Sequence, residues 1–132
     1  MKNQQSGFTL IELIAVIVIL GILAATALPK FVDMSSAAAQ AAVDGVAGNV
    51  GSAMALNYAN AVALNAGVVT GVTKITVANC TDGSSLIQGG LPTGYAITAA
   101  TITGLGTAVS CTLTLTKGST VKTQTFQGIG VP

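Results

Sequence analysis

A single carboxylate stands inside the most apolar segment of the sequence. Glu12 is the only charged residue in the run that extends from Phe8 to Leu28. A run of about 20 apolar residues is long enough for a helix to cross the roughly 30 Å hydrocarbon core of a bilayer. A charge within such a helix is costly and normally has a function and a partner. Glu12 is therefore the first candidate functional residue.

Other groups that could do chemistry are few. The chain has 132 residues, of which 7% are charged, and it contains no histidine, the commonest general base. The net charge of +1 does not support nucleic-acid binding, because such proteins carry basic patches. We expect no enzyme, no cofactor and no metal site. Besides Glu12, the charged residues are scattered as Lys2, Lys30, Asp33, Asp44, Lys74, Asp82, Lys117 and Lys122.

The N-terminal segment has two simple interpretations. A secretory signal peptide would combine Lys2, the apolar run and a cleavage site at 25–27, where the sequence is Ala-Thr-Ala. Glu12 argues against this interpretation, and so does the length of the run. A plain membrane anchor is also possible, but Lys2 and Lys30 flank opposite ends, so the charge bias that sets orientation is weak.

A third interpretation accounts for the whole string Gln4-Gln5-Ser6-Gly7-Phe8-Thr9-Leu10-Ile11-Glu12-Leu13. It resembles the processing site of the type IV pilin family. Precursors in that family have a short, mildly basic leader that ends in Gly, then Phe, Thr-Leu-Ile or Thr-Leu-Val, Glu, and an unbroken apolar stretch. Every position matches. The resemblance is strong from Met1 to about Asn60, and the seven-residue leader is similar to the type IVa class.

The resemblance implies how the N-terminus is processed. A prepilin peptidase would cut between Gly7 and Phe8 and methylate the new amine of Phe8. Phe8 and Glu12 are four residues apart, so we expect them to share one helical face. In a filament, Glu12 could then pair with the Phe8 amine of a neighbouring subunit. Other expected partners are further copies of the chain, the bacterial inner membrane and the inner-membrane pilus assembly machinery; a surface receptor is unknown.

Two residues weaken the predicted helix. Gly21 costs about 1 kcal/mol relative to alanine, and Pro29 in a helix interior costs about 3 kcal/mol. The family resemblance implies one long helix that kinks or melts between Gly21 and Pro29 when the filament forms. The alternative is that the membrane helix ends at Pro29 and a second helix begins there.

The pattern after Pro29 is amphipathic. A buried stripe is predicted at spacings of three and four, and more polar positions lie between its members. Glycines at a spacing of three form a strip that could pack closely on the sheet or on a neighbouring subunit, or could simply reflect composition. The stripe is Val43, Val46, Val50 and Ala53, extended by Met54 and Tyr58; the polar positions are Asp33, Gln40, Asp44 and Asn57; the glycines are Gly45, Gly48 and Gly51.

The C-terminal half is rich in Thr, Gly and Val, a composition typical of strands and turns. We expect strands over 95–99, 111–116 and 120–126, with Cys111, Leu113 and Leu115 on one face. A hairpin turn is predicted at 117–118, another turn at 104–106, and an extra strand or a loop at 72–77. The result would be a three- or four-stranded antiparallel meander packed on the amphipathic part of the helix.

Cys80 and Cys111 are the only cysteines. In an exported protein such a pair predicts a disulfide, which for a loop of about 30 residues is worth roughly 3–4 kcal/mol. Two free buried thiols are the alternative. Asn79-Cys80-Thr81 also fits a glycosylation sequon, a short match that we take as incidental.

The predicted fold is α+β, with a protruding hydrophobic helix half and a small antiparallel sheet. The predicted segments are a leader at 1–7, a transmembrane and filament-core helix at 8–28, an amphipathic helix at 29–62 and a β-rich part at 63–132. The resemblance implies a single-pass inner-membrane precursor with a periplasmic C-terminal part, then a subunit of an extracellular filament for adhesion, twitching motility or DNA uptake. The alternatives are a type II secretion pseudopilin and a minor or competence pilin.

Overall fold

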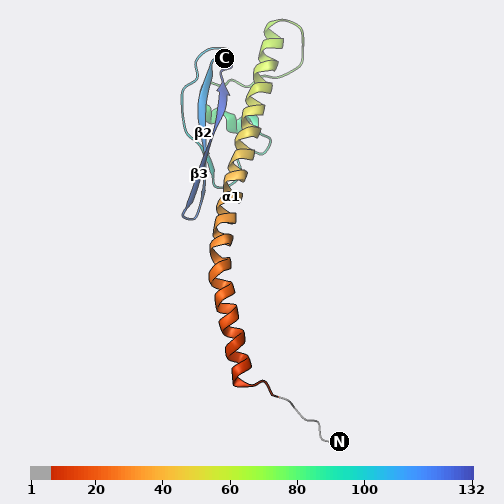
Figure 1. Ribbon diagram of the computed structural model, residues 1–132. Coiled ribbons are helices and arrows are strands. Elements are labelled where there is room, and N and C mark those ends of the chain that lie inside the picture. The colour runs from red at the N-terminus through yellow and green to blue at the C-terminus, as the bar shows by residue number, and fades with distance from the viewer. Residues whose placement is uncertain (1–6) are drawn as a thin grey trace, which may run out of the picture. The chain divides into compact units, whose positions relative to one another are not determined.

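The computed structural model describes residues 7–132, so the first six positions of the predicted leader lie outside it. The elements are α1 (Leu10–Asn65), the 3-10 helix η1 (Cys80–Leu86), β1 (Tyr95–Ile97), β2 (Ala108–Lys117) and β3 (Thr120–Ile129) (Figure 1). The strands form one antiparallel sheet in the order β1-β2-β3. The predicted α+β class is therefore confirmed, with three strands in the sheet.

The chain divides into two compact units, Met1–Ala37 and Ala38–Pro132. In the first unit the large apolar side chains of α1 are exposed, among them Leu10, Ile11 and Leu28. Among the described residues, one helix is apolar enough to cross a membrane, with a mean hydropathy of 2.7 in its most apolar window.

Helix α1 passes through Pro29 without ending there. The alternative of two helices that meet at Pro29 is therefore wrong for this structure. A melted segment between Gly21 and Pro29 within a filament stays a prediction.

Helix α1 ends at Asn65, three residues beyond the predicted boundary at 62, and Gly67 terminates it. Gly67 adopts φ 69°, a left-handed conformation that glycine enters without strain. The Gly67 N–H donates to Leu64 C=O at 3.0 Å, and the Val68 N–H donates to Ala63 C=O at 3.1 Å. These two bonds form a Schellman motif, which satisfies carbonyls that the end of the helix would otherwise leave free.

The core of the second unit lies between α1 and the sheet. The buried helical stripe keeps the predicted spacing of three and four, and its predicted members Val43, Val50 and Met54 are buried. It differs at one turn, where Ala47 is buried and the predicted Val46 is half-buried, as is Ala53. The stripe comprises Val43, Ala47, Val50, Met54, Asn57 and Ala61. It packs in one cluster with sheet residues that include Leu113, Cys111 and Phe126.

Asn57 corrects a second expectation, since we predicted a polar surface position and the side chain is 6% exposed. Its Nδ2 donates to Ile75 C=O at 2.7 Å, and its Oδ1 accepts the Ile75 N–H at 2.8 Å. A buried amide is tolerated when its donor and acceptor are both satisfied. Asn57 therefore holds the loop that follows α1 against the core.

The hairpin β2–β3 follows the predicted pattern closely. Cys111, Leu113 and Leu115 are buried on one face, as alternation in a half-buried strand requires. Lys117 pairs with Thr120, and Gly118 has a φ of 60° in the turn between them. Residues 72–77 form no strand; Val77 makes one isolated antiparallel bridge with Val131.

Two of the three glycines in the predicted strip, Gly45 and Gly48, contact no other element among the described residues. A Cβ added at Gly45 or Gly48 would have no atom within 4 Å outside the local helix, and one at Gly51 would lie 3.7 Å from Phe126 Cβ, an ordinary contact. Close packing of this strip against the sheet is therefore not observed, and packing on a neighbouring subunit stays a prediction.

Candidate functional site

Glu12 has a partner within its own subunit. Thr9 lies just before the first residue of α1, and its C=O accepts the Leu13 N–H at 3.2 Å. Glu12 Oε2 accepts the Thr9 N–H at 2.8 Å and the Thr9 hydroxyl at 2.6 Å, while the Glu12 N–H donates back to Thr9 Oγ1 at 3.4 Å. This reciprocal arrangement is a capping box, which satisfies backbone donors that the start of a helix leaves free.

Sequence reasoning missed the role of Thr9, although the signal was present. Thr9 and Glu12 form the pattern Thr-x-x-Glu directly before an apolar run, which is the sequence signature of a capping box. A negative side chain in the first helical turn also interacts favourably with the helix dipole. Glu12 is therefore satisfied in the single subunit without any second chain.

The capping box also corrects the predicted relation between Phe8 and Glu12. We expected the two residues to share a helical face, but α1 begins at Leu10 and Phe8 lies outside it. The residue that caps a helix has non-helical backbone geometry, so i and i+4 spacing does not place Phe8 over Glu12. The distance between the Phe8 amine and the Glu12 carboxylate is therefore set by the backbone conformation of Phe8 and Thr9, not by helical spacing.

The Gly7–Phe8 peptide bond lies in an exposed stretch that precedes the helix. Residues 7–9 have no regular secondary structure, and the Phe8 side chain is 85% exposed. Exposed segments without backbone hydrogen bonds are where proteolysis concentrates. The local structure is therefore suitable for a peptidase at this junction.

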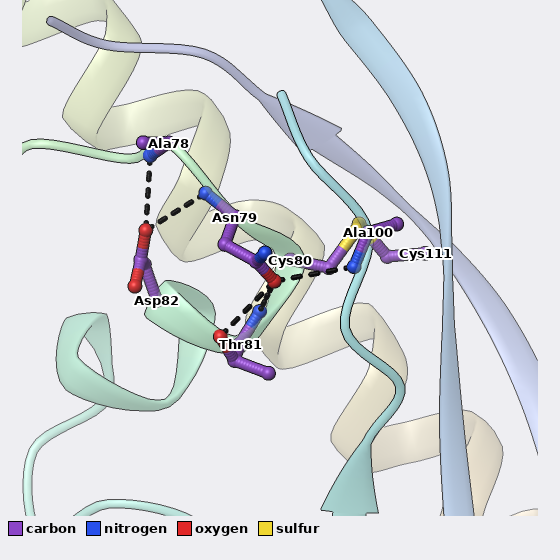
Figure 2. Close-up of a disulfide and its surroundings, with 7 residues drawn as sticks. All are labelled: Ala78, Asn79, Cys80, Thr81, Asp82, Ala100 and Cys111. Carbon is purple, nitrogen blue, oxygen red and sulfur yellow. Dashed lines mark hydrogen bonds between the residues drawn. A yellow bond between two sulfur atoms is a disulfide. The ribbon is translucent and has the colours of Figure 1, made fainter. Parts of the chain in front are cut away.

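A second constellation surrounds the disulfide between Cys80 and Cys111 (Figure 2). This bond confirms the predicted pairing. It joins the start of η1 to β2, and both cysteines are almost completely buried in the core. The cysteines are therefore structural, and the alternative of two free thiols is wrong.

The residues next to Cys80 form a second capping box, which caps the start of η1. Asn79 Oδ1 accepts the Thr81 N–H and the Ala100 N–H, both at 3.2 Å. Asp82 Oδ2 accepts the N–H groups of Ala78 and Asn79 at 2.9 and 2.8 Å (Figure 2). The side chain of Asn79 thus has a structural task, which agrees with an incidental sequon.

The carboxylate of Asp82, the one acid of the C-terminal β-rich part, is taken up by backbone donors. Calcium binds six or more oxygens, usually from several carboxylates. Among residues 7–132 no group of three or more His, Cys, Asp or Glu side chains is placed to hold a metal ion.

The fold and the N-terminal site together define a pilin-like protein: a long helix, apolar and exposed at its N-terminal end, whose C-terminal part packs on a small antiparallel sheet. Residues 2–28 match the prokaryotic N-terminal methylation motif. The type IV narrow pilus major component PilA5 of Thermus thermophilus is 57% identical over 53 residues, which are 40% of this chain and 46% of that protein. The type IV major alpha-pilin of Moraxella bovis is 56% identical over 43 residues, which are 33% of this chain and 27% of that protein.

These findings confirm the resemblance: the chain carries the N-terminal methylation motif of prepilins and is homologous there to type IV pilins. The matched segments span less than half the length of either relative. No solved structure matches the chain.

Proposed function

We propose that this chain is the structural subunit of a type IV pilus. A prepilin peptidase cuts it between Gly7 and Phe8 and methylates the Phe8 amine, and the mature subunit polymerises through α1. Before assembly it is held in the inner membrane by residues 8–28, with the C-terminal part in the periplasm. After assembly it belongs to an extracellular filament that serves adhesion, motility or DNA uptake.

One observation carries this proposal: an exposed apolar helix starts with a single carboxylate directly after an accessible Gly7–Phe8 junction. At about 1.5 Å per residue, the segment 10–28 spans close to the thickness of a bilayer. In lipid its side chains contact acyl chains, and in a filament they contact the same segment of other subunits.

The capping box at Thr9 and Glu12 suggests how Glu12 takes part in filament assembly. In the single subunit, Glu12 accepts hydrogen bonds from Thr9 at 2.6 and 2.8 Å. Cleavage before Phe8 creates an α-amine on the residue that directly precedes the cap residue Thr9, with an ordinary pKa of about 7.7–8.0. In the packed filament, Glu12 adds the Phe8 amine of a neighbouring subunit as a second partner, because opposite charges attract strongly where water is excluded.

The alternative is a pseudopilin of a type II secretion system, which shares the same N-terminus, or a minor pilin. Major pseudopilins resembling this class bind calcium through acids of the C-terminal part. Here Asp82 is used as a helix cap, and the Cys80–Cys111 disulfide stabilises the same region instead. Both observations favour a pilus subunit.

Electron microscopy of filaments sheared from the cell surface, with mass spectrometry of their subunit, tests the proposal. We expect filaments whose subunit begins at a methylated Phe8. A water-soluble periplasmic protein that begins at Leu28 would instead restore the signal-peptide interpretation.

A further inference from the structure

A groove runs between α1 and β3 inside the second compact unit. Its volume is about 430 Å³. One wall is α1 and the other is the segment 124–127 of β3, which is an edge strand of the sheet. The helix wall comprises Asp44, Ala47, Gly48, Gly51, Ser52 and Ala55.

The groove is open because its helix wall is built from small side chains. At Gly48 a Cβ would meet no atom within 4 Å, and at Gly51 only Phe126 comes near. Each of these glycines weakens the helix by about 1 kcal/mol relative to alanine. Packing inside the subunit does not require Gly48, so the open space is maintained at a cost in helix stability.

One end of the groove carries a negative charge. Asp44 is exposed there, and its Oδ1 accepts the Gln40 Nε2–H at 2.8 Å. The same Gln40 nitrogen donates to Thr123 C=O at 3.3 Å, so it closes this end of the groove and orients the carboxylate. The occupant should therefore be narrow and should carry a positive charge.

The hairpin tip, residues 116–121, has these properties. All six residues are exposed, and the turn itself consists of Gly118 and Ser119, which are small. Lys117 stands at its base and is exposed. The other cation of this unit outside the hairpin, Lys74, already donates to Pro132 C=O at 2.8 Å.

We propose that the groove of one subunit receives the hairpin tip of a second copy of this chain, with Lys117 paired to Asp44. The inference rests on the proposed filament and adds a contact outside the apolar helix segment. The tip and the groove are different surfaces, so the contact is heterologous, and a heterologous contact that does not close into a ring generates an open filament. About seven residues lie between the middle of the turn at 118–119 and the middle of the groove segment 124–127, which places successive subunits on the order of 20 Å apart along the strand direction.

Cysteine cross-linking in assembled filaments tests the contact. The native cysteines are disulfide-bonded and buried, so they do not interfere. Ser52 in the groove and Ser119 in the tip are both exposed. We expect filaments of the double variant Ser52→Cys/Ser119→Cys, treated with a mild oxidant, to give a ladder of covalent oligomers on a non-reducing gel, and each single variant to give no ladder.

The matched control is Ser52→Cys/Ser110→Cys, because Ser110 is also exposed but lies on β2 away from the tip. This pair should give no ladder. Normal filaments of Ser52→Cys/Ser119→Cys that stay monomeric on the gel overturn the contact, and so does an equal ladder from the control pair. If the unmodified chain forms no filaments, the proposed function itself fails.

Exchanging the charges of Asp44 and Lys117 tests the contact independently, also if the cysteine variants do not assemble. Asp44→Lys and Lys117→Asp should each lower filament yield about tenfold, because like charges across an interface are costly. The double variant restores the opposite pair, so its yield should return to within about twofold of the unmodified chain. A double variant no better than the worse single variant contradicts the proposal.

Discussion

At the scale of single residues, the capping box changes how the acid in the apolar segment is understood. From the sequence, the partner proposed for Glu12 is the Phe8 amine of a neighbouring subunit in a filament. In the structure Glu12 already accepts two hydrogen bonds from Thr9. Its charge is thus stabilised at the helix start before assembly, and the residue that makes this possible is Thr9.

Replacing Thr9 tests this role. Thr9→Ala removes the hydroxyl that accepts the Glu12 N–H, so the first helical turn should fray. We expect amide hydrogen exchange at residues 11–13, measured by NMR in detergent micelles, to become about fivefold faster, in keeping with the usual loss of an N-cap. Thr9→Ser keeps the hydroxyl and should exchange like the unmodified chain; equal rates in all three proteins would exclude the cap.

Asn57 gives a second prediction at this scale. Asn57→Ala leaves the N–H and C=O of Ile75 without their partners, which should lower the free energy of unfolding by roughly 1–3 kcal/mol. Asn60→Ala is the control, since Asn60 is exposed on the same helix and should change stability by about 0.5 kcal/mol or less. Thermal unfolding of the full chain in detergent provides the comparison, and similar midpoints for the two variants would argue against the Asn57 contact.

At the scale of elements, the sequence predicted α1, the hairpin and the disulfide, because each depends on a local pattern. Alternation at 111, 113 and 115 is visible in one strand, and the Cys80–Cys111 pair was the sole possible pairing. The burial of Ala47 in place of Val46 could not be predicted, because alanine and glycine on both sides of the stripe give little hydrophobic contrast. η1 was missed because its cap, Asn79 with Asp82, lies in a segment without periodicity.

The disulfide should supply a measurable part of the stability of the second unit. It closes a loop with a sequence separation of 31, for which the chain-entropy model gives about 3–4 kcal/mol. We expect a reductant to lower the unfolding midpoint of the full chain clearly. The Cys80→Ala/Cys111→Ala variant should start from the lower midpoint and not respond to reductant. A midpoint that is the same with and without reductant in the unmodified chain would show that the bond contributes little.

Two glycine-to-alanine substitutions should change the free energy of unfolding in opposite directions. A Cβ at Gly128 would overlap Cys111 Sγ and would lie 2.8 Å from Ile102 Cδ1, and the disulfide holds that sulfur in place. Gly128→Ala should therefore destabilise the chain by about 1–3 kcal/mol. Gly45→Ala adds a methyl group in open space on α1 and should stabilise by up to about 1 kcal/mol. Denaturant unfolding compares the two, and a Gly128→Ala variant as stable as Gly45→Ala would contradict the packing described for β3.

At the scale of the whole molecule, two surfaces would contact other subunits in the proposed filament. The first is the apolar segment 10–28 with Glu12 at its start, and the second is the groove with its complementary hairpin tip. The first surface is equally suited to lipid and to other copies of itself, so it does not by itself fix how subunits align. Glu12 is the one charge in the segment, and its proposed partner is an amine created only by cleavage, so this pairing would fix the alignment.

Filament yield of the Glu12→Val variant measures this claim most directly. The substitution removes the charge and keeps the helix apolar, so the variant should remain in the inner-membrane fraction, while sheared surface filaments should fall to a small fraction of those from the unmodified chain. Wild-type amounts of normal filaments from Glu12→Val, with the subunit still beginning at methylated Phe8, would contradict the pairing of Glu12 with a neighbouring amine.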